Sequence, residues 1–186
     1  ENSQAVPRIP ILEYHLVRAR ANGQFIISRA EFRRDLELLY ERGYRPITVA
    51  QLLDKDFSDV PAGMSPVVFT FDDAPPEQFA YVERDGKLEI DTMSVVGMWL
   101  EFQRQHPDWK SRATFCVLSG AQAGHSLFGD GTGAMNQKAE WRFPKLRWLV
   151  ENGFEICNHT LWHMQLSKYS DEAVQEQVAR GQLAID

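Results

Sequence analysis

The sequence predicts an α/β fold in which parallel strands alternate with helices. Short apolar segments rich in β-branched and aromatic residues recur along the chain, as in strands buried on both faces of a parallel sheet. Segments between them carry apolar residues at helical spacing. Two of the strand-like segments end abruptly in polar residues, Asp72-Asp73 and His159, which is typical of a site at the carboxyl ends of parallel strands.

Composition limits the classes of function. The chain has 186 residues, 44% of them hydrophobic and 25% charged, which fits about one globular domain. A net charge of -6 without a basic cluster excludes a nucleic-acid surface, so we expect no nucleic-acid partner. No apolar run approaches the roughly 20 residues that span a bilayer, so no transmembrane segment is expected. Cys116 and Cys157 lie inside strand-like runs, and we interpret them as buried small hydrophobic residues and not as a disulfide.

The individual elements follow from local patterns. After a loose polar tail at residues 1–8, five segments have the strand pattern: 9–15, 46–49, 66–72, 112–118 and 154–158. Helices are predicted from the capping box Ser28–Glu31 to Gly43, at 50–53, at 92–105, from Phe143-Pro144 to Asn152-Gly153 with Leu146, Leu149 and Val150 inward, and from Ser170 to about Gly181.

The segment from about residue 74 to 110 is longer than a plain strand-to-helix connection, so we interpret it as an insert. It contains a turn or hairpin tip at Arg84–Lys87. Its aromatic residues Phe79 and Tyr81 either line a sugar-binding groove or form a local core. The glycine-rich loop tip Gly129–Gly133 lacks the lysine of a phosphate-binding loop, so we interpret it as a flexible loop.

The polar strand ends suggest a metal site. Asp72 and Asp73 need partners, because unpaired buried carboxylates cost several kcal/mol or take up a proton. His159 and His163 are four positions apart and would share one face if the backbone turned helical after His159. Two imidazoles and one carboxylate make the three-ligand site that zinc uses when one position stays open, and the second carboxylate is then free to act as a base.

The segments Thr70-Phe-Asp-Asp73 and His159-Thr-Leu-Trp-His163, in this order, resemble the first two motifs of the polysaccharide deacetylases, carbohydrate esterase family 4. The resemblance implies that Asp72 is the catalytic base and that Asp73, His159 and His163 bind a divalent metal, usually Zn²⁺. It implies a hydrolase that removes N-acetyl groups from a GlcNAc-containing polysaccharide, with a metal-activated water. It also implies an extracellular, periplasmic or cell-surface location, although the chain opens at Glu1 without a methionine or signal peptide.

For the fold, the resemblance implies an incomplete (β/α) barrel like the distorted (β/α)7 barrel of this family. Residues 9–186 would be the N-terminal part of the catalytic domain, with the insert at about 74–110. The family's later motifs, which supply the general acid and the oxyanion donor, do not follow Ser170. Five strands do not close such a barrel, so we expect the remaining strands from downstream sequence or from a second chain.

Several alternatives stay open at this point. The scaffold also fits another C–N amide hydrolase acting on a cyclic imide or ureide, or a non-catalytic glycan-binding relative, although an intact Asp72 argues against the latter. His15 either reaches the site, as a similar Tyr-His segment in secreted relatives implies, or is hydrogen-bonded at a strand end. Asn158 and Thr160 either orient ligands or have local roles. Ala74 replaces the family's usual glycine, which affects the local turn more than metal binding.

Overall fold

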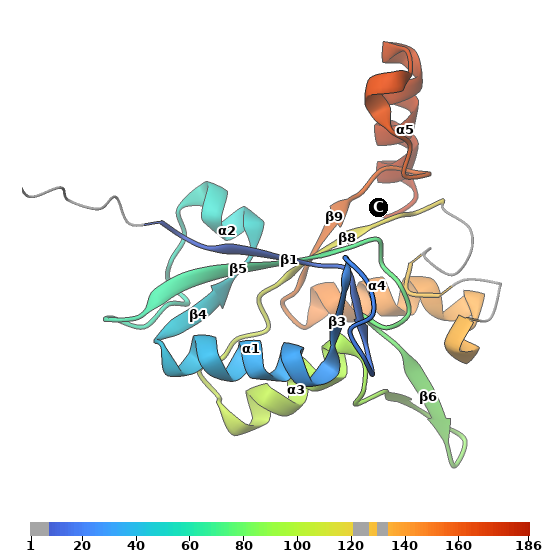
Figure 1. Cartoon of the computed structure of the whole chain (residues 1–186). Helices are drawn as coiled ribbons and strands as arrows, with labels where there is room; N and C mark the ends of the chain where they lie inside the picture. The colour runs from blue at the N-terminus through green and yellow to red at the C-terminus, as the bar shows by residue number, and fades with distance from the viewer. Residues whose placement is uncertain (1–7, 121–126, 130–133) are drawn as a thin grey trace, which may run out of the picture.

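The centre of the molecule is a five-stranded parallel sheet, seen in a computed structural model that describes residues 8–120, 127–129 and 134–186 (Figure 1). Its strands are β1 (Ile11–Tyr14), β4 (Tyr44–Ile47), β5 (Ser65–Asp72), β8 (Thr114–Val117) and β9 (Glu155–Asn158). All five predicted strands are confirmed, with ends shifted by at most two residues. Most of the predicted tail at 1–8 and of the glycine-rich tip at 129–133 lies outside the described residues.

The strand order is β1-β5-β8-β9, and β4 also pairs with β5. Val68 pairs with Ile11 of β1 and with Ile47 of β4, so these two strands flank β5 on opposite sides. On the β4 side, β8 takes over the pairing from Thr70 onwards. Among the described residues the sheet does not close, and β1 and β9 are its edges. The prediction of an α/β fold resembling an incomplete barrel is therefore confirmed.

The described residues form five α-helices beside the sheet, and α1, α3 and α4 lie along one of its faces (Figure 1). Their bounds are α1 (Arg29–Glu41), α2 (Val49–Asp54), α3 (Val95–Gln105), α4 (Arg142–Glu151) and α5 (Asp171–Leu183). The predicted capping box starts α1: Glu31 N donates to Ser28 Oγ, and Ser28 N donates to Glu31 Oε2. Within the described part of the chain, no helix is long and apolar enough to cross a membrane.

Aromatic side chains fill the space between the sheet and these helices. Phe69, Phe71 and Phe115 from the sheet are buried against Phe32 of α1 and Trp99 of α3. Burying such a side chain stabilises a fold by about 1.5–3 kcal/mol relative to leaving it exposed. This cluster fixes β5 and β8 in place, and β5 carries the aspartate pair.

Helix α4 differs from its predicted burial pattern at one residue. Leu146 and Leu149 are buried as predicted, but Val150 is 60% exposed. Neighbouring positions of a helix point about 100° apart, and α4 is covered by the core on one side only. Leu149 faces the core, and Val150 lies about 100° further round the helix, on the side that the core does not cover.

The segment at 74–110, which was interpreted as an insert, contains a hairpin followed by α3. The hairpin pairs β6 (Tyr81–Arg84) with β7 (Lys87–Ile90), and both residues of its turn, Asp85 and Gly86, have positive φ. This confirms the predicted hairpin tip. Phe79 is fully buried and packs against Trp148 and Phe128, so the aromatic residues of the insert form a local core.

Two features of the sheet region were not predicted. A short parallel pair, β2 (Leu16–Arg18) and β3 (Ile26–Ser28), follows β1; three-residue strands are too short to show a period. Cys116 and Cys157 are joined by a disulfide, so interpreting them as separate buried thiols was wrong. They are register partners on neighbouring strands β8 and β9, with Cα atoms 4.3 Å apart, a proximity that their separation in sequence does not show.

Candidate active site

The aspartate pair sits where β5 breaks into a turn. Asp72 is the last residue of β5, and Asp73 and Ala74 follow with φ of +74° and +51°. Successive side chains of a regular strand point to opposite faces, so this left-handed turn is what lets both carboxylates serve one site. Ala74 adopts the conformation that a glycine would favour, at a cost of roughly 1–2 kcal/mol. Phe128 N donates to Ala74 O over 2.8 Å and holds the turn.

A buried lysine stabilises that turn through Phe128. Lys145 of α4 donates to Phe128 O over 2.6 Å and to Gln137 Oε1 over 2.7 Å. Burial lowers the pKa of Lys145 to about 7. Because Phe128 holds Ala74, the lysine fixes the segment against which the aspartate turn rests.

A buried glutamine ties two strand ends together. Gln78 is fully buried, and its Nε2 donates to Asp72 O over 2.7 Å and to His15 O over 2.9 Å. It therefore fixes the carboxyl end of β5 against that of β1. No sequence pattern indicated this role, because Gln78 lies outside every recognisable motif.

The histidines lie on a loop and not on a helix, so the helical turn that was considered after His159 does not form. Thr160 and His163 have φ of +71° and +58°. Asn158 Oδ1 accepts a hydrogen bond from Thr160 N over 2.8 Å, and Thr160 Oγ1 accepts one from His163 N over 3.1 Å. Such side-chain bonds compete with the helix for backbone donors. Asn158 thus has the local role among its alternatives, since it shapes the loop, whereas Thr160 bonds directly to the backbone of His163 and so holds that residue in place.

Helix α5 anchors this loop from the other side. Asn158 Nδ2 donates to Val178 O over 2.8 Å, and Gln177 Oε1 accepts from Trp162 N over 2.9 Å. The helix does not end at Gly181 but continues to Leu183. A Cβ at Gly181 would lie 2.6 Å from Asn158 Oδ1, so the glycine permits close packing against β9.

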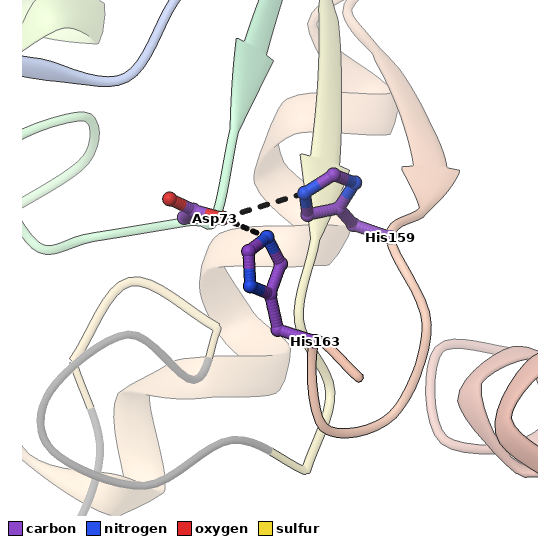
Figure 2. A group of neighbouring side chains, drawn as sticks. All are labelled: Asp73, His159 and His163. Atoms are coloured by element: carbon purple, nitrogen blue, oxygen red, sulfur yellow. Dashed lines mark ion pairs between the residues drawn. The ribbon is translucent and has the colours of Figure 1, made fainter. Parts of the chain in front are cut away.

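The folded chain brings the two motifs together (Figure 2). Asp73 Oδ1 lies 3.3 Å from His159 Nε2 and 3.5 Å from His163 Nε2. One candidate ligand atom from each of these three residues lies within 4.8 Å of the other two. Asp72 stands beside them, with Oδ2 3.9 Å from His159 Nε2.

These side chains fit a divalent cation. Asp73 Oδ1 and His159 Nε2 are buried, and neither has a hydrogen-bond partner in the described part of the chain. Leaving a buried polar atom unpaired costs about 1–3 kcal/mol. Gln78 Oε1, Trp109 Nε1 and Ser119 Oγ are also buried without a partner in this part of the chain, so it is the grouping of Asp73 and His159 with His163 that fits a cation. Tetrahedral zinc with bonds of about 2.0–2.2 Å sets its ligand atoms roughly 3.3–3.5 Å apart. The spacing of Asp73 Oδ1 from the two imidazole nitrogens is in this range.

The two neighbouring carboxylates have different environments. Burial raises the pKa of Asp72, although His159 opposes this effect. The polar contact with His159 lowers the pKa of Asp73 against the effect of burial, and the same contact raises the pKa of His159. Asp73 is therefore held as an anion, as a ligand must be, while Asp72 keeps more of the proton affinity that a base needs.

His15 reaches the site, which decides between its two alternatives. Candidate ligand atoms of Glu13, His15 and Asp72 lie within 4.8 Å of one another, and His15 Nε2 is 3.6 Å from Glu13 Oε1. Sequence reasoning missed Glu13. Its spacing of two from His15 on a predicted strand was a usable signal, because alternate strand residues share a face.

Known proteins share this architecture. Residues 108–186 match the family described as polysaccharide deacetylase, whereas no curated protein sequence matches the chain. The deacetylase PplD of Streptococcus pyogenes, solved in complex with acetate, superposes with a TM-score of 0.63 at 17% identity, over 96% of this chain and 67% of PplD.

Two further solved structures are similar. BC0361, a polysaccharide deacetylase from Bacillus cereus, has a TM-score of 0.62 at 17% identity, over 95% of this chain and 46% of that protein. IcaB from Ammonifex degensii has a TM-score of 0.54 at 17% identity, over 96% of this chain and 69% of IcaB. The chain thus spans less than half the length of BC0361. This chain is therefore similar to the polysaccharide deacetylases in fold over nearly its whole length and in sequence over residues 108–186.

Proposed function

We propose that the protein is a metal-dependent hydrolase that removes N-acetyl groups from a GlcNAc-containing polysaccharide. Asp73, His159 and His163 would hold the cation, for which we propose Zn²⁺. The observation that carries the proposal is the meeting of these three side chains, two of them with unpaired buried ligand atoms, directly beside a further carboxylate. Similarity to the polysaccharide deacetylases supports the choice of reaction.

The residues of the chain have distinct parts in this reaction. A bound cation supplies Lewis acidity toward the acetamide carbonyl oxygen and toward water. The Asp72 carboxylate accepts a proton from the attacking water. The C–N bond of the acetamide breaks, the water oxygen leaves in acetate, and the amine takes up a proton. Gln78 keeps Asp72 in position through the backbone carbonyl of that residue.

The insert belongs to the same proposal. We propose that residues 9–186 form the N-terminal part of the catalytic domain, with an insert at about 74–110. The insert supplies Gln78, which bonds to the carbonyls of Asp72 and His15. It would therefore help to organise the site in addition to covering the core.

We also propose an extracellular, periplasmic or cell-surface location. The disulfide between Cys116 and Cys157 supports an oxidising compartment. Thiol titration of the denatured protein tests this: we expect no free thiol without reductant and two after reduction. Two reactive thiols in the unreduced protein, isolated from its natural source, would remove that support.

Acetate release from N-acetylated chito-oligomers tests the reaction. With Asp72→Asn we expect turnover to fall by about 10²–10⁴-fold, the usual contribution of a general base, while bound zinc measured by elemental analysis stays unchanged. Undiminished turnover by Asp72→Asn would show that another group is the base. Cleavage of small cyclic imides without acetate release would favour the alternative amide hydrolase.

A further inference from the structure

A cavity of about 300 Å³ opens beside the candidate site. It lies where β1 meets the loop between β2 and β3, and its lining includes Glu13, His15, Gln24 and Phe25. Glu13 and His15 also belong to the cluster with Asp72. Two residues that line the cavity are therefore also neighbours of Asp72, the proposed catalytic base.

Phe25 presents an aromatic ring at a fixed place on this cavity. Its side chain is 59% exposed, although its backbone is held by the hydrogen bond from Leu16 N to Phe25 O at 3.1 Å. The next residue, Ile26, begins β3. The ring lies against the His15 imidazole, with centroids 5.0 Å apart. Single exposed apolar side chains are common, so exposure alone says little. The contact with a residue that also reaches Asp72 is what sets Phe25 apart.

The lining groups suit a sugar ring. A pyranose has apolar C–H faces that stack on an aromatic ring and hydroxyl groups around its edge. Glu13, with its side chain 61% exposed, offers a carboxylate to hydroxyl donors, and the exposed Gln24 offers an amide. The volume is at the lower end of the roughly 300–1,000 Å³ of ligand pockets, which favours a single ring.

The path from this cavity to the proposed metal ligands is short. Phe25 contacts His15, His15 lies within ligand-atom distance of Asp72, and Asp72 Oδ2 is 3.9 Å from His159 Nε2. A sugar ring bound at Phe25 would thus lie next to the reacting sugar ring and would not occupy the same position. We propose that Phe25, with Glu13 and Gln24, binds a neighbouring sugar ring of a glycan chain. This rests on the proposed function, because it takes the reacting sugar to lie at Asp72.

Binding measurements separate this proposal from the reaction itself. The probes are the monomer and the tetramer of N-acetylglucosamine, titrated calorimetrically into the zinc-loaded Asp72→Asn protein so that turnover does not interfere. We expect the tetramer to bind more tightly than the monomer. Adding Phe25→Ala should weaken tetramer binding roughly tenfold, leave monomer binding unchanged, and be rescued by Phe25→Trp. The matched control is Phe143→Ala on α4, which removes another exposed phenylalanine, 56% exposed, that does not line the cavity.

Each other outcome overturns the subsite. The proposal fails if Phe25→Ala leaves tetramer affinity unchanged, or if it weakens monomer and tetramer binding equally. It also fails if the tetramer binds none of the variants. Failure of the proposed function looks different, because the wild-type protein would then release no acetate even though Phe25-dependent tetramer binding persists.

Discussion

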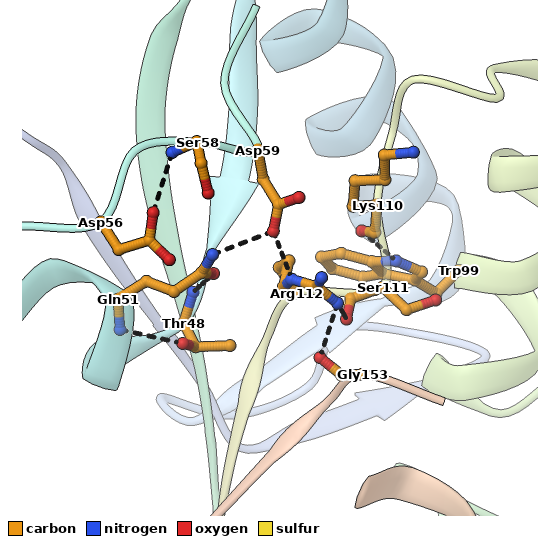
Figure 3. Close-up of polar contacts among 10 residues, drawn as sticks. All are labelled: Thr48, Gln51, Asp56, Ser58, Asp59, Trp99, Lys110, Ser111, Arg112 and Gly153. Carbon is orange, nitrogen blue, oxygen red and sulfur yellow. Dashed lines mark hydrogen bonds and ion pairs between the residues drawn. The ribbon is translucent and has the colours of Figure 1, made fainter. Parts of the chain in front are cut away.

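The two ends of the central sheet treat their polar groups in different ways. At the amino-terminal ends of β8 and β9, Arg112 donates to Asp59 Oδ2 over 2.7 Å and to Gly153 O over 3.1 Å (Figure 3). Gln51 Nε2 donates to the same Asp59 oxygen over 2.9 Å. The protein itself satisfies these groups, and the network joins three segments that are distant in sequence.

At the carboxyl ends the side chains converge but leave atoms unpaired. Asp73 Oδ1 and His159 Nε2 are buried and have no hydrogen-bond partner within the described ranges. They form an ion pair with each other, 3.3 Å apart, when His159 is protonated (Figure 2). The network of Arg112, Asp59 and Gln51 is therefore satisfied by protein groups, whereas the grouped atoms of Asp73, His159 and His163 could take a ligand. In barrel enzymes catalytic groups lie at the carboxyl ends of the strands, and the proposed function would place them there in this chain as well. Changes at the two ends should then have separable effects.

The largest effect is expected at the carboxyl end. Asp73→Asn replaces the only anionic member of the proposed ligand set, and we expect zinc affinity, measured by competition with a chromophoric chelator, to fall more than about 100-fold. Asp59→Asn, at the opposite end, is the matched control and should bind zinc like the wild-type protein. Equal zinc affinity of Asp73→Asn and wild type would contradict the proposed ligand set.

The reverse pattern is expected at the amino-terminal end. Arg112→Met leaves Asp59 without its ion pair, and we expect the free energy of unfolding to fall by about 2–3 kcal/mol, because hydrogen bonds to charged groups are among the stronger ones. Urea denaturation measures the loss. Zinc affinity should not change, and a variant that lost zinc binding without losing stability would show that the two ends are coupled.

A smaller effect is expected from the loop that carries the histidines. Thr160→Val removes the hydroxyl that accepts from His163 N, and we expect roughly tenfold weaker zinc binding, as for other groups that orient metal ligands. Thr160→Ser keeps the hydroxyl and should retain the affinity. If both variants bind zinc equally, the hydroxyl does not orient His163.

The smallest expected effects are changes of stability with pH, and these changes have opposite signs at the two ends of the sheet. Burial opposes ionisation of Asp59, but hydrogen bonds from Gln51 and Arg112 prevail and lower its pKa. Its contribution to stability is therefore present above the unfolded value of about 3.9 and is lost as pH falls through the lower folded pKa. The contact with Asp73 raises the pKa of His159, so that contribution is present below about 6.5 and is lost as pH rises through the raised pKa.

Denaturation of the metal-free protein across the pH range measures both limbs. Asp59→Asn should reduce only the loss of stability at acid pH. His159→Gln should reduce only the loss of stability above neutral pH. A wild-type protein whose stability does not decline above neutral pH would argue against the contact between His159 and Asp73.

Much of the fold was predictable because it depends on local patterns. The apolar run ending at Asp72 and the run ending at Asn158 indicated strands, and Ser28 with Glu31 indicated the start of α1. What failed depends on tertiary context. The disulfide follows from the register of β8 against β9, and the exposure of Val150 follows from which side of α4 the core covers.

The candidate site was predictable in composition and not in geometry. The motif residues Asp73, His159 and His163 do meet, but through a loop with two left-handed residues and not through the helical turn that their spacing would also allow. Hydrogen bonds from the side chains of Asn158 and Thr160 decide that conformation, and spacing in sequence does not reveal them. Gln78 escaped notice for the same reason, since its role depends on two carbonyls of other strands.

A crystal soaked in zinc and measured at the zinc absorption edge tests the central claim most directly. We predict one anomalous peak bounded by Asp73 Oδ1, His159 Nε2 and His163 Nε2, at about 2.0–2.2 Å from each. A peak at another place, such as the cluster of Glu13, His15 and Asp72, with the first three side chains unliganded, would contradict the account.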